Sequence, residues 1–172
     1  MKIRLATVDD APRISSLIRD LAKEFIAHEF SEEAASALLV SMDEPSIRGY
    51  IESGYRYHIA EEGSGLAGVV AVRDNSHLYH LFVSEHFQGQ GLARRLWEVA
   101  KTASLSAGNP GLFTVNSSRY AVGMYENFGF VRQSEEVNCS GVVCIPMKLD
   151  LAANRALQRD AANSAALVSL RH

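Results

Sequence analysis

A short glycine-containing segment carries the residue types best suited to hold an anion. It reads Gln88-Gly89-Gln90-Gly91-Leu92-Ala93-Arg94-Arg95 and follows a strand-like apolar stretch. Two glycines let the backbone turn tightly and present its N–H groups, and the helix expected after Gly91 adds a partial positive charge at its start. Arg94 and Arg95, in the first helical turn, offer side-chain donors to the same anion. The segment therefore predicts a site for a phosphate or pyrophosphate group.

Two common phosphate loops and one hydrolase motif do not fit this sequence. A P-loop needs Gly-Lys-Ser/Thr, and no such triplet follows Gly91. A dinucleotide fingerprint needs a third glycine where Arg94 stands, and it needs the first strand of a parallel sheet. The Gly-x-Ser-x-Gly elbow is also missing, so serine hydrolase chemistry has no nucleophile.

The elements that position this segment follow from hydrophobic periodicity and turn residues. Alternating and β-branched stretches predict strands at residues 3–6, 55–62, 66–73, 77–83, 112–116, 130–133 and 142–149. Helical spacing and capping residues predict helices that begin near residues 9–10, 31, 45, 92 and 119. Antiparallel hairpins mixed with crossover helices predict an α/β (α+β) fold with a mixed sheet.

The glycine segment and the strand before it match the first of two motifs shared by one protein family. Gln88-x-x-Gly91-x-Ala93 fits the pattern Gln/Arg-x-x-Gly-x-Gly/Ala. The triplet Leu81-Phe82-Val83 precedes it at the spacing that the family shows.

The second motif lies downstream, where a strand ends in Asn116 and a helix carries Tyr125 shortly before Gly129-Phe130. With both motifs in order, residues 3–149 resemble the GNAT superfamily, the acyl-CoA-dependent N-acetyltransferases. The sequence departs from many relatives at Gly123, where they carry proline.

This resemblance implies a mostly antiparallel sheet of about seven strands flanked by helices, with its fourth and fifth strands splayed around CoA. It also implies that Phe82 and Val83 pair through their backbone with the pantetheine arm, and that the Val83 N–H polarises the thioester carbonyl. The other residues that it assigns to acetyl-CoA are Gln88, Gly89, Gln90, Gly91, Leu92, Ala93 and Arg94 at the pyrophosphate and Asn116 at the pantetheine.

Tyr125 is the catalytic acid that the resemblance implies, because it would lie beside the thioester sulfur. A phenol at that place can protonate the departing thiolate, whose conjugate acid has a pKa of about 8.5 if it behaves like a cysteine thiol.

The general base is less narrowly defined. Relatives with a known base often carry Glu or His at positions eleven or nine before the Gln/Arg of the loop, which are His77 and Tyr79 here. Strand alternation places both on one face with Leu81, while His80 points the other way unless a bulge shifts the phase. With a reference pKa of about 6.5, His77 suits the task, and Tyr79, His80 or water are alternatives. His77 and His80 do not form a metal site, because an i, i+3 pair on a strand diverges.

Charge is distributed unevenly along the chain of 172 residues, whose formal net charge is −3. Residues 20–62 hold ten acidic and three basic side chains, so that segment carries −7 and the rest +4. Because the first helices of the resembled family wall the acceptor side, this distribution predicts a cationic acceptor. The alternative is that these acids lie on solvated helix faces.

Cysteine usage and the lack of targeting signals suggest a reducing cytoplasm. Cys139 and Cys144 flank an expected turn at Ser140-Gly141 and are expected to be free thiols. Residues 1–10 lack the apolar core of a signal peptide, and the longest apolar run, residues 65–72, is too short to cross a bilayer.

The sequence therefore predicts an N-acetyltransferase domain at residues 1–149, followed by a tail at 150–172 that is helical or partly ordered. The enzyme would transfer an acetyl group from acetyl-CoA to a primary amine by direct attack in a ternary complex, with no metal. The alternative is a non-catalytic acyl-CoA-binding or sensing module on the same fold. No nucleic-acid or membrane partner is expected, and the protein would be a monomer or homodimer.

Overall fold

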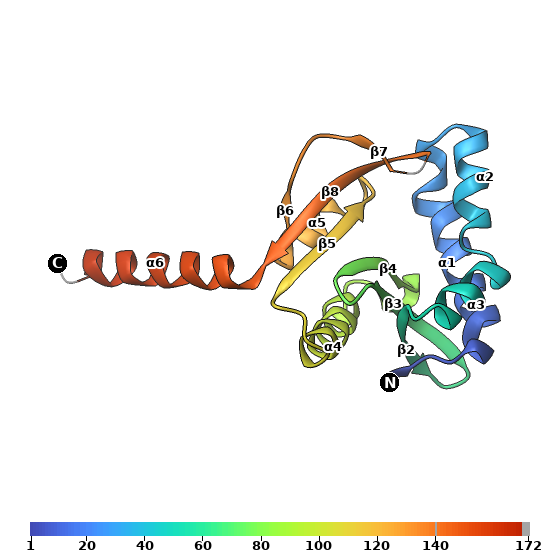
Figure 1. Cartoon of the computed structure of the whole chain (residues 1–172), viewed down its shortest axis with the longest axis horizontal. Helices are drawn as coiled ribbons and strands as arrows, with labels where there is room; N and C mark the ends of the chain where they lie inside the picture. Colours follow the sequence, from blue (N-terminus) through green and yellow to red (C-terminus); the bar gives the residue numbers. More distant parts are fainter. Residues whose placement is uncertain (140, 170–172) are drawn as a thin grey trace.

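The computed structural model of the chain describes residues 1–139 and 141–169 (Figure 1). Its strands are β1 Lys2–Leu5, β2 Arg56–Glu62, β3 Gly65–Arg73, β4 His77–Val83, β5 Leu112–Ser117, β6 Val131–Arg132, β7 Val137–Cys139 and β8 Val142–Asp150. Its α-helices are α1 Ala11–Phe25, α2 Glu32–Val40, α3 Glu44–Glu52, α4 Leu92–Ser106, α5 Val122–Asn127 and α6 Leu151–Ser169. Short 3-10 turns are η1 Val8–Asp10, η2 Ala27–Glu29 and η3 Glu85–Phe87.

The strands form one mixed sheet in the order β1-β2-β3-β4-β5-β8-β6, and β7 pairs with β8. All these pairs are antiparallel except β4 with β5, which run parallel. The predicted mixed, mostly antiparallel α/β fold is confirmed. The strand that sequence periodicity missed is β7, because its three residues are too short to show a period.

Two hydrophobic clusters bury the faces of the sheet. One contains the apolar face of α4 and residues of α5, with Trp97 against Phe113 at a ring separation of 5.0 Å. The other contains Ile14 and Ile18 of α1 and Ile47 of α3. The helices on both sides therefore hold the central strands rigidly and leave the ends of the strands for function.

Gly68 allows α4 to lie close against β3. A Cβ at this position would be 2.8 Å from the Leu96 Cδ1 atom and 3.0 Å from the Phe82 carbonyl oxygen. The first distance is shorter than real Cβ contacts and the second is tighter than most of them, so a side chain would push α4 away from the sheet. This packing fixes where α4 begins, and hence where the glycine segment lies.

Helix α6 projects away from the rest of the chain (Figure 1). It follows β8 directly and is about 28 Å long at 1.5 Å per residue. Its described side chains are almost all exposed, Leu157 by 67%. The last part of the expected tail, residues 170–172, lies outside the described residues.

Candidate active site

The centre of the sheet opens where β4 and β5 separate. These strands are paired only at His77 with Thr114 and at Leu78 with Val115, and they diverge beyond that point (Figure 1). A cavity of about 830 Å³ is lined by both strands, by the glycine segment and by α1, α2 and α5. A parallel pair that opens in this way leaves one edge of β4 free to bind an extended chain.

The free edge of β4 is formed by the backbone of Leu81 and Val83. Ser84 donates its N–H to the Ala67 carbonyl at 2.9 Å, so Ser84 faces β3. Backbone direction alternates along a strand, so Phe82 also faces β3, whereas Leu81 and Val83 face the gap. The expectation that Phe82 offers its backbone to a ligand is thus corrected. Leu81 takes that place, as strict alternation from Val83 would have indicated.

A β-bulge in β4 changes which side chains share a face. His80 is opposite Ala71 but Leu78 is opposite Val72, so Tyr79 is an extra residue in β4. As a result, the rings of Tyr79 and His80 lie on the same face with centroids 4.5 Å apart.

Because of the bulge, two of the candidate bases lie on a different face of β4 from the one predicted. Leu78, Leu81 and Val83 pack into the α4 cluster, whereas Tyr79 and Phe82 pack towards the α1 cluster. Tyr79, and by alternation from Leu78 also His77, therefore lies on the face opposite Leu81, contrary to expectation. His80 faces away from Leu81 as expected, on the same side as Tyr79.

The glycine segment presents unpaired backbone N–H groups. Gly89 and Gly91 have φ values of 71° and 78°, which favour glycine. Helix α4 has no side-chain cap, and the N–H of Arg95 is the first to bond back, to Gly91. Among the described residues, the N–H groups of Leu92, Ala93 and Arg94 therefore have no hydrogen-bond partner at the positive end of the helix. This geometry suits an anion.

Side chains around this segment brace it rather than extend its donors. Gln88 donates to the Val83 carbonyl at 3.0 Å, and Gln90 donates to the His86 carbonyl at 2.8 Å. Arg94 donates to the Asn127 carbonyl at 3.0 Å and lies over the Phe128 ring. The expected side-chain donation by Arg94 to the anion is therefore replaced by a bond to the end of α5.

Arg95 and Asn116 complete the positions expected at this site. The Arg95 guanidinium is 3.9 Å from the Met1 sulfur. It therefore gives no support to the expected anion contact. Asn116 is exposed on β5 and lines the cavity.

Tyr125 lies at the cavity with its ring packed in the core. The residue is 5% exposed, and its ring meets that of Phe130 at 5.7 Å. Its hydroxyl has no hydrogen-bond partner among the described residues and is not sealed from solvent. Burial raises the Tyr125 pKa above its usual value, so the phenol keeps its proton.

His77 begins the short stretch in which β4 and β5 are paired, one residue before the last pair, Leu78 with Val115. Its Nδ1 atom is 2.7 Å from the Thr114 Oγ1 atom, and the ring lines the cavity. Burial, together with the nearby Arg73 cation, lowers the His77 pKa to about 4. The imidazole is therefore neutral near pH 7 and can accept a proton.

His80 is buried more deeply, and burial lowers its pKa to about 3. The Tyr57 hydroxyl lies 3.0 Å from its Nδ1 atom and has no other acceptor in the described part of the chain. We therefore assign the tautomer in which Nδ1 accepts from Tyr57 and Nε2 carries the proton. A ring in this tautomer has no free lone pair for a substrate.

Tyr79 is unsuited to act as a base. Its hydroxyl donates to the Tyr50 hydroxyl at 3.2 Å, which donates to the Ser41 carbonyl at 2.9 Å. Burial raises the Tyr79 pKa, so its proton is retained.

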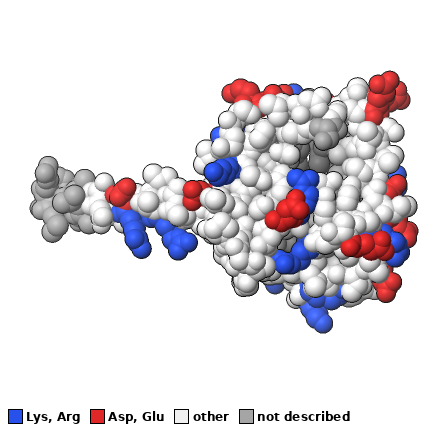
Figure 2. Space-filling view, viewed as in Figure 1, with Lys and Arg blue, Asp and Glu red and all other residues white. Residues whose placement is uncertain are grey.

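No Asp or Glu of the described residues lines the cavity, although residues 20–62 hold ten acids. Glu61 pairs with Arg4 and Arg13, and Glu62 pairs with the N-terminal amine. Figure 2 shows acidic and basic side chains scattered over the face in view rather than gathered in one acidic surface. The alternative of solvated faces therefore holds, and the reason for a cationic acceptor is lost.

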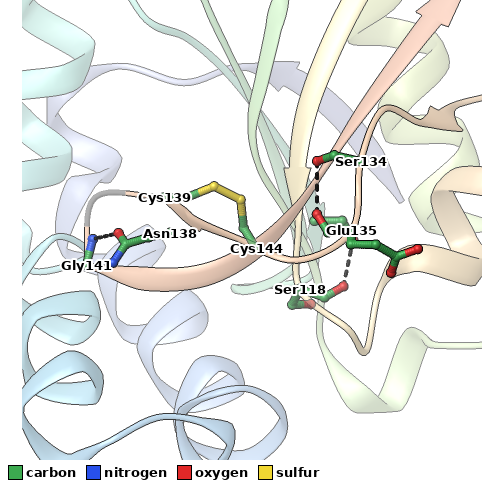
Figure 3. Close-up of a disulfide and its surroundings, with 8 residues drawn as sticks. Ser118, Ser134, Glu135, Asn138, Cys139, Gly141 and Cys144 are labelled. Atoms are coloured by element: carbon green, nitrogen blue, oxygen red, sulfur yellow. Dashed lines mark hydrogen bonds between the residues drawn. A yellow bond between two sulfur atoms is a disulfide. The ribbon is translucent and has the colours of Figure 1, made fainter.

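A disulfide joins Cys139 of β7 to Cys144 of β8, which corrects the expectation of free thiols (Figure 3). Both cysteines line the cavity. The hairpin that they cross-link points towards α1 and α2, and β8 contacts α2. Ser140 of the expected turn lies outside the described residues, and Gly141 has a φ of 94°.

Within residues 1–139 and 141–169, no three His, Cys, Asp or Glu side chains are grouped to hold a metal ion. Among the helices of the same residues, none is long and apolar enough to cross a membrane.

The family profile described as Acetyltransferase (GNAT) domain matches residues 26–151. The chain therefore belongs to the GNAT acetyltransferase family, as its two motifs indicated. A comparison with curated protein sequences gives no match.

Solved structures share the fold at low identity. A GCN5-related N-acetyltransferase from Rhodopseudomonas palustris is 20% identical with a TM-score of 0.74, covering 87% of this chain and 95% of that one. The PaiA N-acetyltransferase of Thermoplasma acidophilum, solved with coenzyme A, is 17% identical with a TM-score of 0.66, covering 86% and 98%. The acetyltransferase YncA of Salmonella typhimurium, solved with acetyl-CoA, is 18% identical with a TM-score of 0.61, covering 88% and 94%.

Proposed function

We propose that this protein is an N-acetyltransferase that moves an acetyl group from acetyl-CoA to a primary amine by direct attack in a ternary complex. One observation carries the proposal: the free edge of β4, the uncapped start of α4 and the Tyr125 ring all line one cavity. Each suits a different part of a thioester donor.

Each part of acetyl-CoA, from the pyrophosphate to the thioester, has a matching feature in the cavity. The free N–H groups of Leu92, Ala93 and Arg94 suit the pyrophosphate, since a helix start favours anions. The outward backbone of Val83 and Leu81 suits the amides of pantetheine, which would add to β4 as an extra strand. Complexes with coenzyme A and acetyl-CoA among structures of the same fold support this assignment.

The chemistry needs an electrophile, a proton donor and a proton acceptor. The amine nitrogen attacks the thioester carbon, and an N–H of Leu81 or Val83 that faces the gap stabilises the oxyanion. The C–S bond then breaks, and the Tyr125 hydroxyl gives its proton to the thiolate. His77, or a water held by it, takes the proton that the amine loses.

Release of the CoA thiol from acetyl-CoA in the presence of a panel of primary amines tests this proposal. We expect amine-dependent thiol release together with an acetylated amine of the correct mass. Tight acetyl-CoA binding without amine-dependent release would instead establish the non-catalytic binding or sensing module.

The extent of the catalytic unit is also a proposal. We place it at residues 1–149, because α6 begins at Leu151 and its exposed side chains leave the body of the protein (Figure 1). Limited proteolysis of the full chain should remove α6 first and leave acetyl-CoA binding intact. Light scattering of the full chain would then decide between the monomer and homodimer that we expect.

A cytoplasmic location is proposed on the sequence evidence, and the disulfide is the observation against it, since disulfides are rare in that compartment. Alkylation of free thiols in freshly lysed cells tests the point. Labelled Cys139 and Cys144 would support the cytoplasm, and protected cysteines would argue for an oxidising compartment.

A further inference from the structure

The walls of the cavity on the side of α1 and α2 are almost entirely apolar. Their side chains are Phe25, Phe30, Leu38, Tyr120, Val142 and Val143. They come from α1, the turn after η2, α2, the segment before α5 and the β7–β8 hairpin. Under the proposed function the donor takes the free β4 edge and the glycine segment, so acceptor specificity depends on what these walls can hold.

Phe25 and Tyr120 form an aromatic surface in this part of the cavity. Their rings stack with centroids 5.2 Å apart and an angle of 21° between planes, which joins α1 to the segment that follows β5. Tyr120 is 58% exposed, so much of its ring is free to meet another group. Aromatic faces bind ring-sized apolar groups well.

The cavity lining also lacks, within the described residues, the negative charges that would bind a polycation. Arg73 is its only charged lining residue within the described part of the chain, and its partner Asp74 lies on the solvent side, 82% exposed. The two lining imidazoles, His77 and His80, are neutral near pH 7. A second ammonium group against these walls would lose water without gaining a carboxylate.

We propose that the acceptor is a primary amine on an apolar body of about the size of one aromatic ring, without a second positive charge. The body packs against Phe25, Tyr120 and Leu38, and the amine points towards His77. The inference rests on the proposed function, and it replaces the cationic acceptor that charge distribution along the sequence had suggested.

The first test compares two amines under identical conditions, 2-phenylethylamine and 1,4-diaminobutane. We expect kcat/KM to be at least 10-fold higher for 2-phenylethylamine, which corresponds to about 1.4 kcal/mol. Equal values, or a preference for the diamine, would overturn the inference while leaving the proposed function in place. Absence of acetylation with either amine and with the wider panel would overturn both.

Variants of the apolar walls give a second test. Tyr120→Ala should lower kcat/KM for 2-phenylethylamine several-fold without changing KM for acetyl-CoA. Because Tyr120 is exposed, the variant should fold like the parent protein. Leu38→Glu should place a carboxylate at the cavity and raise kcat/KM for 1,4-diaminobutane relative to 2-phenylethylamine.

Val40→Glu is the matched control for Leu38→Glu, because Val40 lies on the same helix, is 58% exposed and does not line the cavity. It should leave the ratio between the two amines unchanged. An equal shift of the ratio in both variants would show that the apolar wall does not set specificity.

Discussion

The His77 Nδ1 atom lies 2.7 Å from the Thr114 Oγ1 atom, at the first of the two positions where β4 and β5 are paired. The contact joins the two strands within the short paired stretch that precedes their divergence around the cavity. It fixes the ring at one nitrogen and leaves the other for a proton, provided that Nδ1 donates to the threonine oxygen. The same contact therefore lies beside the opening between the two strands and holds the candidate base in place.

His77→Gln should lower kcat by about 100-fold, within the usual contribution of a general base. With a His77 pKa of about 4, the imidazole is neutral throughout pH 6–9, so the decrease should be similar across that range. The measurement is kcat against pH for both proteins. A rising limb that disappears in the variant would show that His77 titrates there, contrary to this expectation.

Thr114→Val is the companion variant, since it removes the hydrogen bond but keeps the size of the side chain. Thr114 acts as a positioning residue, so kcat should decrease by less than in His77→Gln while KM for acetyl-CoA stays the same. A loss equal to that of His77→Gln at unchanged stability would make Thr114 as important as the imidazole.

Tyr125→Phe should lower kcat by about 10- to 1000-fold, because it removes only the proton donor to the thiolate. The ring packing against Phe130 is kept, so acetyl-CoA affinity and the thermal midpoint should change little. Steady-state kinetics and equilibrium CoA binding measure the two effects separately. An unchanged kcat would remove Tyr125 from the mechanism.

Acid should destabilise the protein below pH 6.5 through its buried histidines. The His80 pKa is lowered to about 3 in the folded state, so between pH 6.5 and 3 the unfolded chain binds a proton that the folded chain does not. This contribution is present above pH 6.5 and is lost as pH falls, at about 1.4 kcal/mol per pH unit. Urea unfolding at several pH values measures it.

His80→Gln is the variant for this measurement, because the glutamine carbonyl can still accept from Tyr57. The slope of unfolding free energy against pH should become shallower, and His58 and His77, whose pKa values are also lowered by burial, should keep it above zero. Identical slopes for both proteins would exclude His80 as a source of acid sensitivity.

Reduction of the Cys139–Cys144 disulfide should loosen the β7–β8 hairpin. For so short a loop, the chain-entropy estimate of the stabilisation is about 2 kcal/mol. Because both cysteines line the cavity, KM for the acceptor should rise on reduction while KM for acetyl-CoA stays constant. The Cys139→Ser/Cys144→Ser double variant should have the acceptor KM of the reduced protein, and adding reductant should not change it. If reductant leaves the acceptor KM of the wild-type protein unchanged, the disulfide has no role in acceptor binding.

Much of the fold was predictable from local sequence. Strand and helix periods, the glycine pair at Gly89 and Gly91, and the paired motifs around Val83 and Tyr125 identify the family and predict an anion site. These features depend on residues close together in the chain, where steric and hydrogen-bonding preferences act directly. The sequence by itself thus determined the architecture and the family, and it predicted the donor side of the cavity.

Only the tertiary structure decided the acceptor side. The bulge at Tyr79 reversed the expected face of the candidate bases, because pairing with β3 sets the phase of β4. The acids of residues 20–62 do not line the cavity, and two of them, Glu61 and Glu62, pair instead with Arg4 and with the N-terminal amine. The net charge of a sequence segment does not say where its side chains lie, and only the folded structure shows whether each charge is at the surface or in a site.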